Sequence, residues 1–189
     1  MNITREKMNN CSKSYTDGDK DALHLEAIYQ LQNSGRYNLP YIQFIEELSE
    51  LIEVVAEIPD GAETVEDDNI TIHLAEELAD VIGTSRFVQL AVIIDDDMLK
   101  EAGNCYHDGL YADATLQRRI TLLLSNAIQR TSKYIRKGGK IRLAEAIVLA
   151  RAASDIIIKA LNVEVGDIDT IAAMKMERLE YRINFEGIR

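Results

Sequence analysis

The stretch that decides the fold is residues 40–57, which read PYIQFIEELSELIEVVAE. Its apolar residues recur about once per helical turn, at Ile45, Leu48, Leu51, Ile52 and Val55. Side chains at this spacing share one face of an α-helix, and proline at the start of the stretch is tolerated in a first helical turn. We therefore expect a helix over residues 40–57 with one buried stripe.

Patterns on both sides of this stretch predict further helices. We expect them over residues 23–35, 70–94, 112–137, 140–162 and 167–183, with a Gly138-Gly139 turn and, at residues 95–97, a helix end followed by a new N-cap. The composition agrees, since the 189-residue chain has 47% hydrophobic residues, two prolines, ten glycines and no tryptophan. Such a mixture favours long helices over a turn-rich β fold. The predicted fold class is all-α, a helical bundle.

Charge and cysteine usage narrow the class of partner. The formal net charge of −11 would repel a nucleic-acid backbone, whereas a small phosphorylated ligand bridged by metal avoids that repulsion. Cys11 and Cys105 are too few and too far apart for a disulfide framework, so we expect free thiols in a reducing compartment. We expect residues 1–13 not to form a signal peptide, because they lack an apolar segment, and no apolar run approaches the ~20 residues of a membrane span. We expect a soluble, cytoplasmic protein without nucleic-acid or membrane partners.

The two halves of the chain share one plan. Residues 74–82, LAEELADVI, can be laid on residues 149–157, LARAASDII, so that Asp155 matches Asp80 while Ala152 replaces Glu77. We infer a tandem duplication of a helix-pair unit in which the first copy alone kept its acids. The expected organisation is a flexible N-terminus (1–16), a first half (17–95), a linker (96–111) and a second half with a C-terminal helix (112–189).

Acidic residues of two successive helices carry the predicted chemistry. On the first helix they are Glu46, Glu47 and Glu50, and on the next they are Glu77 and Asp80. Residues three or four apart share a helix face, so two antiparallel helices would bring both rows to one place. Converged carboxylates need a neutralising cation, and Mg²⁺, a hard cation that takes oxygen ligands, fits best, with Mn²⁺ as the alternative.

Two other interpretations of these acids were weighed. Neighbouring glutamates on a helix are commonly a solvated face, although here both rows adjoin the apolar stripes. A ferritin-like di-iron site needs Glu-x-x-His pairs, which His24, His73 and His107 do not supply. We expect no histidine or cysteine at ligand spacing to the acids, which disfavours a softer metal.

The residues EELSE (46–50) followed by ELAD (77–80) resemble the E-E-x-x-E … E-x-x-D signature of the MazG-like all-α nucleoside triphosphate pyrophosphohydrolases. The closing KMERLEYR (175–182) resembles the basic C-terminal helix of short, phage-type members. The resemblance implies hydrolysis of a (deoxy)nucleoside triphosphate to the monophosphate and pyrophosphate. By motif position, it implies metal ligands at Glu47, Glu50, Glu77 and Asp80, with Glu46 a further ligand or the group that orients the attacking water.

The second half departs from the family pattern. Family members usually pair two identical subunits, so the resemblance implies a homo-oligomer, a dimer, and the acid-free half could stand in for a partner. Basic residues would then bind substrate phosphates, namely Lys133, Arg136, Lys140, Lys175, Arg178 and Arg182. The other interpretation is that Lys133, Arg136 and Lys140, together with Lys137 and Arg142, solvate a turn and cap a helix C-terminus, and the same alternative holds for the three basic residues of the C-terminal helix. Alternative functions are a dUTP-specific or phosphoribosyl-ATP type of phosphohydrolase, or a helical bundle that binds without turnover.

Overall fold

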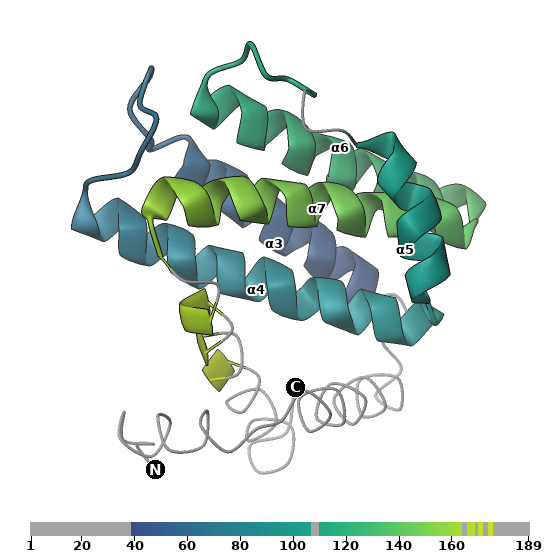
Figure 1. Cartoon of the computed structure of the whole chain (residues 1–189). Coiled ribbons are helices and arrows are strands. Elements are labelled where there is room, and N and C mark those ends of the chain that lie inside the picture. Colours follow the sequence, from purple (N-terminus) through teal and green to yellow (C-terminus); the bar gives the residue numbers. More distant parts are fainter. Residues whose placement is uncertain (1–38, 107–109, 164–165, 169, 172–173, 176–189) are drawn as a thin grey trace, which may run out of the picture.

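A computed structural model describes residues 39–106, 110–163, 166–168, 170–171 and 174–175 (Figure 1). Within these residues the regular structure is helical, and the predicted all-α class is confirmed. The expectations for residues 1–38, including the flexible N-terminus and the helix over 23–35, lie outside the described residues.

The helices follow the predicted order along the chain. They are α3 (Leu39–Val55), α4 (Asp68–Val92), α5 (Asp96–Ala102), the short 3₁₀ helix η1 (Gly103–Cys105), α6 (Leu116–Lys137) and α7 (Lys140–Leu161). The helices predicted over 40–57, 70–94, 112–137 and 140–162 correspond to α3, α4, α6 and α7. The described residues between 166 and 175 are helical, as expected for the start of the 167–183 helix, most of which lies outside the described residues.

Side-chain caps explain where the observed ends differ from the predicted ones. Oδ1 of Asp67 accepts hydrogen bonds from the backbone N–H groups of Asn69 and Ile70 at 2.8 and 3.2 Å, so α4 begins earlier than predicted. The side chain of Thr115 accepts from the N–H of Arg118, so α6 begins later. The predicted N-cap at the start of α5 is Asp95, whose carboxylate accepts from the N–H of Met98 at 2.9 Å. Each cap satisfies N–H groups that the helix itself leaves unpaired.

Four helices form a closed bundle (Figure 1). Helix α3 packs against α4 and α6, while α7 packs against α6 and α4, and α5 lies across α7. The tight Gly138-Gly139 connection makes α6 and α7 an antiparallel hairpin, and both glycines have positive φ, as the predicted turn requires. Each helix of the ring therefore has two neighbours, and the hairpin α3–α4 packs side by side with the hairpin α6–α7.

Contacts at the two ends of the bundle fix the helix directions. Nε2 of Gln117 at the start of α6 donates to the carbonyl of Ala56, just after α3, at 3.0 Å. At the opposite end the rings of Tyr41 and Tyr134 meet edge to face, with centroids 5.2 Å apart. The N–H of Val65, before α4, donates to the carbonyl of Ala160 near the end of α7 at 3.0 Å. All neighbouring helices in the ring are thus antiparallel.

One hydrophobic core runs through the bundle. Its largest fully buried side chains come from every helix of the ring and include Phe44, Leu48, Leu51, Leu74, Leu78, Ile120, Leu123, Leu124, Leu143, Ile147 and Ile157. On α3 the predicted stripe is buried at Leu48, Leu51 and Val55, while Ile45 and Ile52 stay partly exposed. Burial of these apolar side chains is the main driving force that holds the ring together.

The segment predicted as a linker, residues 96–111, contains α5 and η1. Leu99 and Ala102 are buried, and α5 packs on α7, so much of the segment belongs to the packed body. The division into halves stays a prediction, as does the tandem duplication. The packing of α3 on α6 and α4 on α7, each antiparallel, is the arrangement that two copies related by a two-fold axis would adopt.

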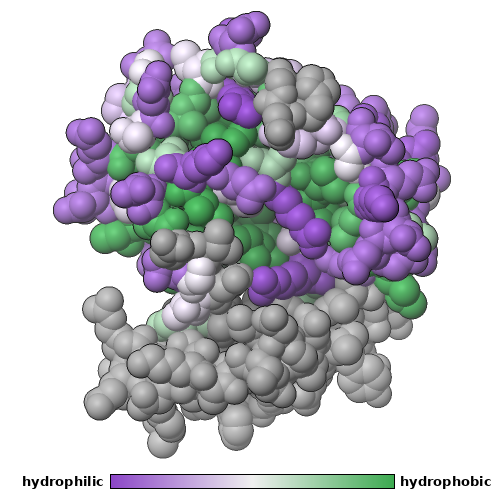
Figure 2. Space-filling model, in the orientation of Figure 1, coloured by the Kyte–Doolittle hydropathy of each residue, from purple (hydrophilic) through white to green (hydrophobic). Residues whose placement is uncertain are grey.

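The surface mixes hydrophilic and apolar patches. Figure 2 shows hydrophilic side chains running between hydrophobic areas on the face that carries α4, α5 and α7. Among the described residues, the exposed large hydrophobic side chains are Ile42, Ile72, Ile93 and Ile135. No described helix is long and apolar enough to cross a membrane.

The α6–α7 turn gives a test of the fold. Gly138 has φ 68° and ψ −166°, a region that glycine alone occupies readily, and a Cβ placed there would meet no atom within 4 Å. Gly138→Ala should therefore lower the free energy of unfolding by about 1–3 kcal/mol through backbone strain alone. Gly103→Ala is the matched control, because Gly103 has φ −54° and equally open space around it. Urea denaturation measures both, and equal stabilities would contradict the turn geometry.

Candidate metal centre

Three carboxylates from two helices meet on the outer side of the α3–α4 pair. Glu47 of α3 and Glu77 and Asp80 of α4 each offer an oxygen, and these oxygens all lie within 4.8 Å of one another. Glu77 and Asp80 share a face because they are three residues apart on one helix. Leu48, which follows Glu47, and Leu78, which follows Glu77, are buried where α3 packs on α4. Their burial brings Glu47 close to the two acids of α4. The predicted convergence of the two acidic rows is present for these three residues.

The raised pKa values of two of these carboxylates indicate that the cluster has too little positive charge around it. Burial, followed by the negative charges of Asp80, Glu50 and Glu77, raises the pKa of Glu47 from 4.5 to about 7. Burial is also the largest cause that raises the pKa of Glu77, to which Asp80 and Glu50 add. Partly desolvated carboxylates at such short distances repel one another, so a proton or a cation is favoured at this place.

Glu77 has an oxygen without a partner among the described residues. Its Oε2 atom is fully buried and makes no hydrogen bond there, while the side chain as a whole is 17% exposed. A buried carboxylate oxygen left unpaired is costly, and a cation between the helices would pair it. Three carboxylates without soft ligands suit Mg²⁺ or Mn²⁺, so the residues present fit the expected cation.

A lysine from the C-terminal segment reaches the same cluster. Nζ of Lys175 forms an ion pair with Oδ2 of Asp80 and donates to the backbone carbonyl of Glu76 at 2.8 Å. Lys175 was predicted as a group that binds substrate phosphate. In the structure its ammonium lies directly against Asp80.

The other two predicted acids lie at the edge of the cluster. Glu50 is exposed, yet close enough for its charge to raise the pKa of both Glu47 and Glu77. Glu46 is also exposed, and it is not part of the group of three converging oxygens. Their roles as ligand or water-orienting group stay predictions.

The basic residues predicted from α6 and α7 lie elsewhere. Lys133 donates to Oε1 of Gln129 at 3.2 Å and Arg136 to the carbonyl of Ser132 at 3.4 Å, both within α6. Nζ of Lys140 donates to the carbonyl of Ile93 at 3.3 Å, just beyond the end of α4. At a rise of about 1.5 Å per residue, that end is about 18 Å from Asp80 along α4. Arg178 and Arg182 lie outside the described residues.

One neighbour was missed by the sequence analysis. Nε2 of His73 lies 3.9 Å from Oε1 of Glu77, a proximity that was not predicted. The signal was present, because the two residues are four apart on one helix. The imidazole is 49% exposed and does not join the converging carboxylates.

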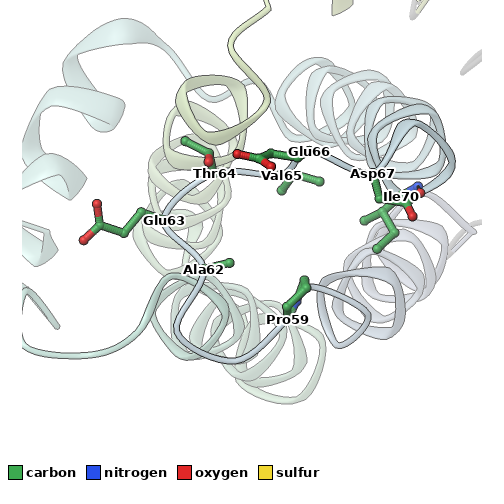
Figure 3. Close-up of a pocket in the computed structure, with 8 residues that line it drawn as sticks. All are labelled: Pro59, Ala62, Glu63, Thr64, Val65, Glu66, Asp67 and Ile70. Carbon is green, nitrogen blue, oxygen red and sulfur yellow. Dashed lines mark hydrogen bonds between the residues drawn. The ribbon is translucent and has the colours of Figure 1, made fainter.

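A separate hollow lies in the loop between α3 and α4 (Figure 3). Its volume is about 270 Å³, and its lining is Pro59, Ala62, Glu63, Thr64, Val65, Glu66, Asp67 and Ile70. None of these residues is basic, and three are acidic, so the hollow would repel an anionic phosphate. The hollow contains none of the converging acids, and Glu63 points away from it in Figure 3.

Compared with protein-family models, with curated proteins and with solved structures, the chain gives no match.

The raised pKa of Glu47 predicts how the stability of the metal-free protein depends on pH. Between about pH 4.5 and 7 the folded state holds a proton on Glu47 that the unfolded chain has released, so stability falls as the pH rises through this window. Glu47→Gln should flatten that fall, with a residual slope from Glu77. Thermal denaturation in a chelator measures it, with Glu53→Gln, an exposed acid of the same helix, as control. An unchanged slope in Glu47→Gln would contradict the assigned pKa.

Proposed function

We propose that this protein is a Mg²⁺-dependent hydrolase that cleaves (deoxy)nucleoside triphosphates to the monophosphate and pyrophosphate. The observation that carries the proposal is the convergence of Glu47, Glu77 and Asp80 from α3 and α4. These acids occupy three positions of the E-E-x-x-E … E-x-x-D pattern that the sequence resembles. The buried, unpaired oxygen of Glu77 and the raised pKa of Glu47 support a cation at the same place.

The acidic residues of α3 and α4 would have different roles in the reaction. Glu47, Glu77 and Asp80 hold the cation, with Glu50 available at the rim. When bound, Mg²⁺ supplies neutralisation of the phosphate charges and a fixed geometry for the triphosphate. Glu46, exposed beside Glu47, orients the attacking water and accepts hydrogen bonds from it. The chemistry demands little more, since phosphoryl transfer depends mainly on positioning and charge stabilisation.

The positions of the basic residues of α6 and α7 suit a homodimer. Lys140 lies near the far end of α4, about 18 Å from Asp80 along that helix, and Lys133 and Arg136 make hydrogen bonds within α6. In the proposed homodimer, the α6–α7 turn of one protomer would approach the acids of its partner and supply positive charge to the phosphates. Within one chain, Lys175 is the lysine that the described residues place against the cluster.

The function is tested by incubating the protein with each of the common dNTPs and NTPs in the presence of Mg²⁺ and measuring the release of pyrophosphate. Wild type should release pyrophosphate from at least one nucleotide. Glu47→Gln should lose at least about 100-fold in rate, since even outer-shell partners of metal sites are worth 10–100-fold. Mn²⁺ in place of Mg²⁺ should support turnover, and excess chelator should abolish it.

Glu53→Gln is the matched control, an acid of the same helix that is exposed and outside the cluster. If Glu47→Gln keeps its activity while the wild type is active, the assignment of the site is wrong. If no nucleotide yields pyrophosphate or any other product at high protein concentration, the proposed enzyme activity is wrong.

A further inference from the structure

The contact between Lys175 and the acids is made by a packed segment of chain. Ile168 is buried and Ile171 packs against the core, and both precede Lys175 on a stretch whose described residues are helical. Residues 168, 171 and 175 are three and seven positions apart, so they share one face of a helix. The apolar side chains thus hold the segment in place, and its next inward position delivers an ammonium group to α4.

Lys175 pairs with a carboxylate that a cation at the cluster would also use. Its ammonium pairs with Oδ2 of Asp80, and the carbonyl of Glu76 gives it a second acceptor at 2.8 Å. Both partners of the ion pair are partly shielded from water, with 31% of the lysine side chain and 27% of the aspartate side chain exposed. A divalent cation close to Asp80 would repel the ammonium and compete for the same carboxylate.

The ammonium is an incomplete substitute for such a cation. A single positive charge at Asp80 does not pair with Glu47, and the nearest basic side chain that the structure describes beside Glu77 is His73, which lies 3.9 Å away and is charged only when protonated. A divalent cation touching all three carboxylates would neutralise more charge at shorter distances. Exchange of one for the other is therefore favourable once the cation is present.

We propose that Lys175 is a counter-ion latch, which neutralises Asp80 and holds the C-terminal segment on α4 until a divalent cation binds Glu47, Glu77 and Asp80 and displaces it. The inference rests on the metal site of the proposed function. The displaced ammonium sits on a flexible four-carbon stem and stays close to the cluster, where it meets the phosphates of a nucleotide. Cation binding and the contact of Lys175 with α4 are thereby coupled.

The test is a direct measurement of Mn²⁺ binding by isothermal titration calorimetry to the full chain, without nucleotide. Lys175→Met removes the competing charge and keeps the length of the stem, so it should bind Mn²⁺ about tenfold more tightly, which corresponds to about 1.4 kcal/mol. Lys175→Arg keeps the charge and should bind as the wild type does. Lys100→Met, an exposed lysine of α5, is the matched control for the loss of one positive charge.

Thermal denaturation gives a second readout that does not involve activity. Without metal, Lys175→Met should melt at a lower temperature than the wild type, because the acids lose their counter-ion. With Mn²⁺ it should gain more in melting temperature than the wild type, as tighter binding to the folded state requires.

The outcomes separate the latch from the proposed function. Equal Mn²⁺ affinities in wild type and Lys175→Met overturn the latch and leave the metal site standing. Tighter binding in Lys175→Met supports the latch even if no nucleotide is hydrolysed, which would count against the enzyme activity alone. Absence of Mn²⁺ binding in both proteins removes the metal site, and the latch falls with it.

Discussion

The antiparallel contact between α3 and α4 is the constraint on which the rest of the site depends. Leu48 and Leu51 of one helix and Leu74 and Leu78 of the other are fully buried in the core. Their burial fixes how the two helices are turned about their axes, and the acids beside them have no freedom to avoid one another. Hydrophobic packing thus forces negative charges together at a place where only a proton, a lysine or a metal relieves the repulsion.

The remaining helices serve this contact in different ways. The hairpin α6–α7 closes the ring and completes the core, since α6 packs against α3 and α7 packs against α4. Beyond α7, buried Ile168 holds the segment that brings Lys175 to Asp80. The packed pair α3–α4 therefore sets the distances between the carboxylates. Lys175, which follows α7 in the chain, supplies a positive charge to them.

Much of the fold could be predicted from local sequence patterns. The helices on residues 40–57 and 140–162 are marked by apolar periodicity, by Pro40 and by the two glycines of the turn, and they agree closely with α3 and α7. The starts of α4 and α6 were less accurate, because they depend on whether Asp67 and Thr115 accept a particular backbone hydrogen bond. The acids that share a helix face were predicted, because their spacing along the chain is a local property. The proximity of His73 to Glu77 was not predicted, although their spacing is equally local.

The sequence by itself determined the helical class, the acids that share a helix face and the excess of negative charge, because each follows from residue type and from the period of a helix. Only the tertiary structure decided which acids converge and which basic side chains lie beside them. It separated Lys140, near the far end of α4, from the cluster, and it brought Lys175 to Asp80 from a distant part of the chain. Such pairings depend on how helices pack, and packing depends on side chains far apart in sequence, so no local pattern encodes them.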